Sequence, residues 1–250
     1  MKRFLTATVL CFFLAACGNL TPTISPSELS IEAYALSEPP QEEWTQLPFV
    51  DTTEGDPRLK HEDERSQSFP DASCIQEDQY GFCAMLGSDQ LFAREDWSEP
   101  ASGLVLVTRN GEEIYRIPIG EASPVPTLRG LWVYDNHWVI ETVFVNTASS
   151  SWAVGQITMD GELLNDQYGY EEAFGLQTIK GKPFYFIKKD GKINANYDGV
   201  EITLGYDEIP HYNCCMASSL NPMIAQIMVA FFAREGSNWY YVEMGAFDQQ

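Results

Sequence analysis

Basic residues are scarce in this chain. Its 250 residues include 15 lysines and arginines against 36 aspartates and glutamates, so the formal net charge is −21. Nucleic-acid binding relies on lysine and arginine to neutralise phosphates. We therefore expect no nucleic-acid partner. The acidic protein surface is also repelled by anionic lipid headgroups, so attachment to a membrane has to come from another feature.

Catalytic signatures are also missing. The chain has only three histidines, His61, His137 and His211, and it contains no HExxH, GxSxG or SxxK motif. Zincin, α/β-hydrolase and penicillin-binding chemistry therefore lack their signatures. Paired carboxylates such as Glu171-Glu172 can serve glycoside hydrolysis, but among 36 acidic residues such a pair is first expected on a solvated face. We expect no cofactor and no metal.

No apolar run is long enough to cross a bilayer, which takes about 20 residues as a helix. Leu5–Ala16 has 12 residues and Met223–Ala233 has 11. The first follows Lys2 and Arg3 and precedes small residues, as in a secretory signal peptide. The second is expected to be a core strand.

The end of the signal-like segment carries a specific motif. Leu14-Ala15-Ala16-Cys17 resembles the lipobox of bacterial lipoproteins. The resemblance implies a signal peptide over residues 1–16, cleavage before Cys17, and lipid attached to that cysteine. Two or more acyl chains anchor a protein stably, so we expect lipid anchoring in the cell envelope, on the non-cytoplasmic side of a membrane. Loss of Lys2 and Arg3 leaves 13 basic residues against 36 acidic ones, a formal charge of −23.

Residues 17–72 differ in composition from the rest. Stretches such as TPTISPSELS and SEPPQEEW are rich in Pro, Ser and Glu and have no strict period. Such segments bury too little apolar surface to fold. We expect a disordered, acidic tether here, followed by a single all-β domain over residues 73–250.

The remainder of the chain alternates short apolar runs with turn pairs. Asn-Gly and Asp-Gly pairs supply the positive φ of type I′ turns, which match strand twist. Seven signals of this kind between β-branched and aromatic runs predict an antiparallel hairpin array. They are Asn110-Gly111, Asp135-Asn136, Asp160-Gly161, Lys180-Gly181, Asp190-Gly191, Asp198-Gly199 and Glu235–Asn238.

Several expected strands are apolar on both faces. In PFYFI, Phe184 and Phe186 face one way, and Tyr185 and Ile187 face the other. Burial on both faces indicates stacked sheets. A sandwich, a small propeller and an irregular hairpin repeat all fit this pattern.

One segment suggests internal repeats. Lys189-Asp190-Gly191-Lys192 followed by Tyr206-Asp207-Glu208 resembles the WG-repeat pattern over about 45 residues, 168–210. Ile193-Asn194 stands where that pattern has Trp-Gly. The resemblance implies a hairpin repeat, and no activity is carried over from it.

Four cysteines remain after the signal peptide: Cys74, Cys83, Cys214 and Cys215. An even number outside the cytoplasm suggests two disulfides, with three possible connectivities. A Cys74–Cys83 bridge would force a strained vicinal pair at 214 and 215, so we favour cross-pairing. Within HYNCC, His211 to Cys215, a metal or redox site is the alternative.

Asn194 to Gly199, NANYDG, resembles the start of a calcium loop, but Gly205 stands where the loop needs a bidentate glutamate. We expect a turn. We expect most of the large aromatic side chains to pack in the core; as the alternative, the candidate binding aromatics are Trp132, Trp138, Trp152 and Trp239.

Two classes of function follow. The favoured one is a non-catalytic binding or scaffolding domain with an envelope protein or glycan as partner. The rival is an envelope hydrolase that acts on glycan or peptidoglycan through paired carboxylates. A pocket with two carboxyl groups beside a tryptophan would favour the rival, and shallow aromatic patches would favour binding.

Overall fold

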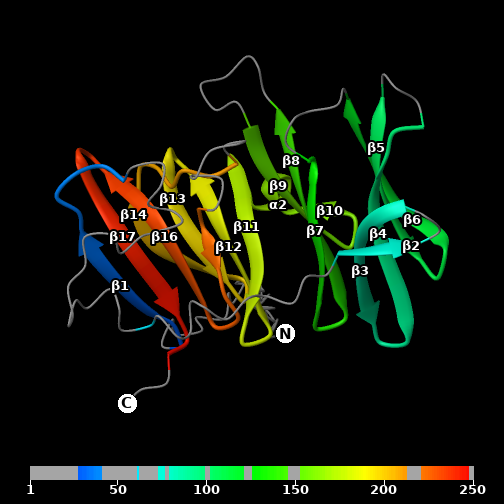
Figure 1. Cartoon of the computed structure of the whole chain (residues 1–250), viewed down its shortest axis with the longest axis horizontal. Helices are drawn as coiled ribbons and strands as arrows, with labels where there is room; N and C mark the ends of the chain where they lie inside the picture. The colour runs from blue at the N-terminus through cyan, green and yellow to red at the C-terminus, as the bar shows by residue number, and fades with distance from the viewer. Residues whose placement is uncertain are drawn as a thin grey trace, which may run out of the picture.

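A computed structural model describes residues 28–40, 61, 73–76, 79–98, 102–120, 126–145, 153–212 and 221–247. These residues form four antiparallel sheets that stand in a row along the long axis of the molecule (Figure 1). The fold is all-β and built from hairpins, as the sequence predicts. We number the sheets first to fourth along the row, starting from the sheet that contains β2.

The first sheet is a five-stranded meander in the order β2-β3-β4-β5-β6. Its strands are β2 (Ser73–Gln76), β3 (Gln79–Leu86), β4 (Asp89–Asp96), β5 (Gly103–Arg109) and β6 (Glu112–Gly120).

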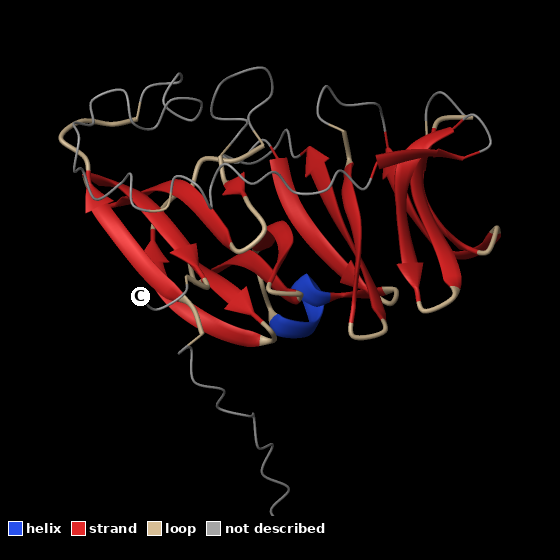
Figure 2. Cartoon of the chain, turned by 60° about the horizontal axis from the view of Figure 1, so that its bottom comes forward, coloured by secondary structure: helices blue, strands red, loops and turns tan. Residues whose placement is uncertain are grey.

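The second sheet has the order β10-β9-β8-β7. Its strands are β7 (Leu128–Tyr134), β8 (His137–Val145), β9 (Ala153–Met159) and β10 (Glu162–Leu163). The short helix α2 (Leu164–Tyr168) follows it and lies at one edge of the row (Figure 2).

The third sheet is a meander, β11-β12-β13-β14. Its strands are β11 (Glu172–Ile179), β12 (Lys182–Lys189), β13 (Lys192–Tyr197) and β14 (Val200–Tyr206). The segment that resembles a WG repeat, residues 168–210, therefore begins at the last residue of α2 and covers this sheet.

The fourth sheet, β1-β17-β16-β15, joins both ends of the described chain. Its strands are β1 (Ser30–Ala35), β15 (Met223–Ile224), β16 (Met228–Glu235) and β17 (Asn238–Gly245). The structure differs here from the sequence expectation, because β1 lies in the stretch we assigned to the tether. It pairs with β17 over six residues, from Ser30 opposite Gly245 to Ala35 opposite Tyr240.

The hairpin turns follow the predicted chemistry. Both residues of six predicted pairs have positive φ, from Asn110 at 52° and Gly111 at 83° to Asp198 at 53° and Gly199 at 78°. In the seventh, Gly236 has a φ of 60°. The turn reading of NANYDG is also confirmed, since Asp198-Gly199 connects β13 to β14.

Strand β12 shows why the sheets stack. Phe184 and Phe186 pack toward the fourth sheet in a cluster that includes Phe231, whereas Tyr185 and Ile187 pack toward the second sheet. All four side chains are buried. The predicted two-sided burial of this strand is therefore confirmed.

The row is open. The first and fourth sheets lie at opposite ends of the long axis, with the second and third between them (Figure 1). Contacts run between neighbours: β3 and β4 with β7, β9 with β11, and β14 with β16. Of the three architectures that the sequence allowed, the stacked hairpin repeat fits best.

The expected cross-pairing of the cysteines is wrong for Cys74, which bonds to Cys83 with 5.9 Å between their Cα atoms. The physical reason is strand register. Cys74 on β2 lies opposite Gly81 on β3, which places Cys83 diagonally across on the same face. Cys17, Cys214 and Cys215 lie outside the described residues.

Candidate functional site

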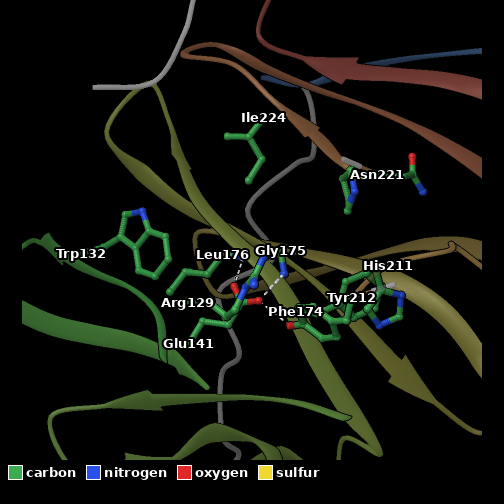
Figure 3. A pocket seen from close by; sticks show the side chains of 11 residues that line it. Arg129, Trp132, Glu141, Phe174, Gly175, Leu176, His211, Tyr212, Asn221 and Ile224 are labelled. Carbon is green, nitrogen blue, oxygen red and sulfur yellow. Dashed lines mark hydrogen bonds between the residues drawn. The ribbon is translucent and has the colours of Figure 1, made fainter. Parts of the chain in front are cut away.

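The residues that the structure describes line two hollows among the sheets that bear on function. The smaller, which we call the cavity, has a volume of about 120 Å³ and lies where the second, third and fourth sheets meet (Figure 3). Its lining residues are Arg129, Trp132, Glu141, Phe174, Gly175, Leu176, His211, Tyr212, Asn221, Pro222 and Ile224. Ligand sites usually measure about 300–1,000 Å³, so the cavity is too small for a sugar or peptide.

Glu141 on β8 forms the floor of the cavity. Its carboxylate accepts hydrogen bonds from the main-chain N–H groups of Gly175 at 3.2 Å and Leu176 at 2.7 Å. Strand β11 is bulged at this point, and Gly175 has a φ of 69°. The carboxylate therefore satisfies N–H groups that the bulge removes from the β ladder.

Tyr212 completes this arrangement by donating its hydroxyl hydrogen to Glu141. Burial, followed by the negative charge of Glu141, raises the pKa of Tyr212 well above its ordinary value. The phenol is therefore a fixed hydrogen-bond donor at neutral pH and not a general base.

His211 and Glu172 form a second buried contact beside the cavity. His211 Nε2 is 3.0 Å from Glu172 Oε1, and its Nδ1 is 2.5 Å from the carbonyl oxygen of Ile209. Both ring nitrogens therefore face acceptors. The ring also stacks on Phe174 at 3.6 Å between centroids. His211 therefore contacts both Glu172 and Phe174 of strand β11.

Glu171 and Glu172, which the sequence offered as a possible carboxylate pair, do not form a shared site. Glu171 is exposed and accepts a hydrogen bond from the N–H of Gly191 at 2.8 Å. Glu172 is buried and accepts one from the N–H of Gly155 at 3.0 Å. Neighbouring residues at the start of a strand point to opposite faces, so these two carboxylates do not share a site.

The larger hollow, which we call the groove, has a volume of about 700 Å³ and lies between the first sheet and the start of the second. It is lined by Gln79, Tyr80, Gly81, Phe82, Arg94, Glu95, Asp96, Trp97, Ser98, Pro126, Leu128 and Arg129. Its size falls within the range of ligand sites. It combines aromatic rings with side chains of both charges.

Trp97, just beyond the end of β4, is held firmly at the groove. Its Nε1 donates to Glu95 Oε2 at 2.9 Å, and Glu95 Oε1 accepts from the N–H of Leu128 at 2.8 Å. The indole lies against Gly103, where a Cβ would approach the ring to 2.3 Å. Glu95 therefore fixes the indole and ties the first sheet to the second.

Tyr80 on β3 presents an open aromatic surface, since 67% of the residue is exposed. It contacts Phe82 edge-on, with 6.2 Å between ring centroids. Gly81 lies between them, and a Cβ there would come within 2.3 Å of the carbonyl oxygen of Ala93. The missing side chain allows β3 to lie close to β4 beneath the two rings.

Arginines bring positive charge to this part of an acidic protein. Arg94 Nη1 is 3.2 Å from Asp96 Oδ2. Hydrogen bonds from Ser98, followed by Arg94, lower the pKa of Asp96 below its ordinary value. Arg129 is exposed, lines both hollows and lies 5.7 Å from the centroid of the Tyr212 ring.

The predicted binding tryptophans do not gather at the groove. Trp132 lines the cavity, Trp138 is buried in the core between the first two sheets, and Trp239 is half-buried on β17. Trp152 lies outside the described residues. Sequence reasoning missed Trp97 and Tyr80, although a tryptophan in the polar stretch AREDWSEP is a usable signal, because no apolar pattern there accounts for it.

The other predicted site residues have structural partners. In NANYDG, Asn194 accepts from the N–H groups of Leu204 and Gly205 at 2.9 and 3.0 Å, and Asn196 accepts from that of Gly199 at 3.1 Å. His137 pairs with Asp160 at the exposed end of a hairpin.

A comparison with known families and with curated proteins finds no match. Among the residues that the structure describes, no helix has the length and apolar character needed to cross a membrane.

Proposed function

We propose that this chain is a lipid-anchored protein of the cell envelope whose β domain binds a ligand in the groove without chemical conversion. The observation that carries the proposal is the groove itself, with the exposed Tyr80 and the fixed Trp97 beside paired charges. Aromatic rings with a few well-placed polar groups are typical of recognition sites.

The lining favours a glycan as the ligand. Rings such as Tyr80 and Trp97 present flat apolar faces on which sugar rings stack, and Arg94, Asp96 and Gln79 offer donors and acceptors for hydroxyl groups. A glycan fits a groove of about 700 Å³ better than it fits a cavity of about 120 Å³.

Hydrolysis remains the rival function because Glu95 and Asp96 line the same groove as Trp97. Both carboxylates, however, have partners. Glu95 accepts from Trp97 and Leu128 with its two oxygens, and Asp96 is bound to Ser98 and Arg94. A general acid has to hold a proton, whereas the contacts with Ser98 and Arg94 lower the pKa of Asp96.

Binding is tested with soluble peptidoglycan fragments and other envelope glycans by isothermal titration calorimetry. Tyr80→Ala removes an exposed ring without touching the core, so it should weaken binding by about fivefold, which corresponds to about 1 kcal/mol. Tyr168→Ala, at another exposed tyrosine, serves as the matched control and should bind as the parent does. Equal glycan affinities of the two variants would contradict the groove as the binding site. Release of shorter glycans would favour the hydrolase.

The anchor is tested separately. Cys17→Ala removes the residue that the lipobox resemblance marks for lipid, so the protein should move from the membrane fraction to the soluble fraction. Unchanged sedimentation with membranes would contradict the lipid anchor and leave the groove proposal intact.

A further inference from the structure

Three metal-ligand side chains meet on the outer face of the fourth sheet, the face turned away from the third. Glu32 on β1 lies directly opposite Glu243 on β17, and His61 lies over both. The nearest ligand atoms of the three side chains all lie within 4.8 Å of one another. They come from parts of the chain that are far apart in sequence.

His61 points to a ligand at this place. The residue is only 5% exposed, and its ring stacks on Phe247 with 3.5 Å between centroids and 8° between planes. The stacking directs Nε2 toward Glu32, at 3.6 Å from Oε1. Nε2 has no hydrogen-bond partner among the residues that the structure describes. Buried ring nitrogens are normally satisfied, so an exception facing two carboxylates calls for a bound species.

Two tyrosines orient the carboxylates. Tyr34 donates its hydroxyl hydrogen to Glu32, and Tyr241 donates to Glu243 Oε1 at 2.9 Å. Both tyrosines lie on the same face as the glutamates, with 6.4 Å between their ring centroids. Hydrogen bonds of this kind fix the direction of carboxylate ligands in metal sites.

We propose that Glu32, His61 and Glu243 bind one divalent metal ion of the zinc class. Imidazole nitrogen and carboxylate oxygen are both ordinary zinc ligands, and three protein ligands leave a fourth position for water. A set with one nitrogen favours zinc over calcium, which prefers oxygen ligands alone. The ion would join the N-terminal strand and His61 to the last strand, and so close the end of the row.

The test uses the full chain in detergent after dialysis against a chelator. Isothermal titration calorimetry and elemental analysis should give one Zn²⁺ per chain, and added Zn²⁺ should raise the melting temperature because it binds only the folded state. His61→Ala should lower zinc affinity by at least about tenfold. With Co²⁺ in place of Zn²⁺, the visible absorption bands should change in the same variant.

His137→Ala is the matched control, because His137 also contacts an acidic residue, Asp160, but on an exposed turn. It should bind zinc as the parent does. Glu32→Gln, at a half-buried position on an edge strand, supplies the measurement if His61→Ala does not fold. No saturable binding, equal affinity in the site variants and the control, or a clear preference for Ca²⁺ would each overturn the proposal. In those cases the three residues are a cluster of ionisable side chains only.

Discussion

Glu141 on β8 accepts a hydrogen bond from the main-chain N–H of Leu176 on β11, 35 positions later in the chain, at 2.7 Å. One side chain of the second sheet thereby completes the backbone hydrogen bonding of the third. Glu95 does the same for the N–H of Leu128 between the first two sheets. The row of sheets is therefore connected by buried or half-buried carboxylates as well as by apolar packing.

Replacement of Glu141 tests this connection. Glu141→Ala removes the acceptor of the buried N–H of Leu176 and of the half-buried N–H of Gly175. Loss of the acceptor of a buried N–H group costs about 1–3 kcal/mol of stability. The melting temperature should fall by several degrees, since about 1 kcal/mol corresponds to about 2–4 °C for a domain of this size. Glu113→Gln, which breaks an exposed pair with Arg116, should change it little. Equal melting of Glu141→Ala and the parent would contradict the connecting role.

The local disulfide predicts a definite thiol pattern. Cys74→Ser should free the thiol of Cys83 and leave the state of Cys214 and Cys215 unchanged, which peptide mapping without reduction will show. A bridge that closes a loop of about ten residues contributes about 3 kcal/mol in the chain-entropy model, so the variant should also melt at a lower temperature. A disulfide-linked peptide of the parent that joins Cys74 to Cys214 or Cys215 would contradict the local bridge and support cross-pairing.

Asp207 links the third sheet to the fourth and makes stability depend on pH. Its carboxylate binds Lys192 Nζ and the N–H of Gly236, both at 2.6 Å, and these contacts lower its pKa below the ordinary 3.8. A lowered folded-state pKa contributes stability above the unfolded value, and that contribution is lost as pH falls through the folded value.

Asp207→Asn should therefore have a lower melting temperature than the parent at pH 7. The difference between the two melting temperatures should become smaller below about pH 4. Thermal unfolding between pH 7 and pH 3 checks this. Glu112→Gln, at an exposed position on β6, is the control. If the difference in melting temperature between Asp207→Asn and the parent stays constant at low pH, the carboxylate charge is not what links the sheets.

Gly103→Ala tests how Trp97 is held in the groove. The new Cβ would approach the indole to 2.3 Å, so the ring has to shift from the position that its hydrogen bond to Glu95 fixes. We expect a small loss of stability, a shifted tryptophan fluorescence spectrum and weaker glycan binding. The spectral shift should disappear in a Trp97→Phe background, and its persistence there would place the change elsewhere.

Strand β1 predicts where the folded domain begins. A chain that begins at residue 28 should have the same melting temperature as the full chain. A chain that begins at residue 73 lacks β1 and His61. The loss of β1 exposes Tyr241, which is fully buried in the full chain. Its melting temperature should fall by at least about 4 °C, equivalent to about 2 kcal/mol. If the shorter chain melts as the longer one does, β1 contributes nothing to the fold.

The sequence by itself determined the hairpin turns of this protein and the strands that flank them. Asn-Gly and Asp-Gly pairs place positive φ angles locally, and the alternation in PFYFI assigns both of its faces to cores. These features depend on neighbouring residues only, so a linear pattern is enough to predict them.

Only the tertiary structure decided which distant residues meet. The sequence shows no apolar pattern around β1 strong enough to place it on β17, because an edge strand needs just one covered face. The meetings of Glu141 with Leu176, Trp97 with Gly103, and His61 with Glu32 and Glu243 likewise depend on strand order and sheet stacking. Contacts of this kind join residues whose separation in sequence follows no fixed period, so they are physically set by packing and not by local conformation.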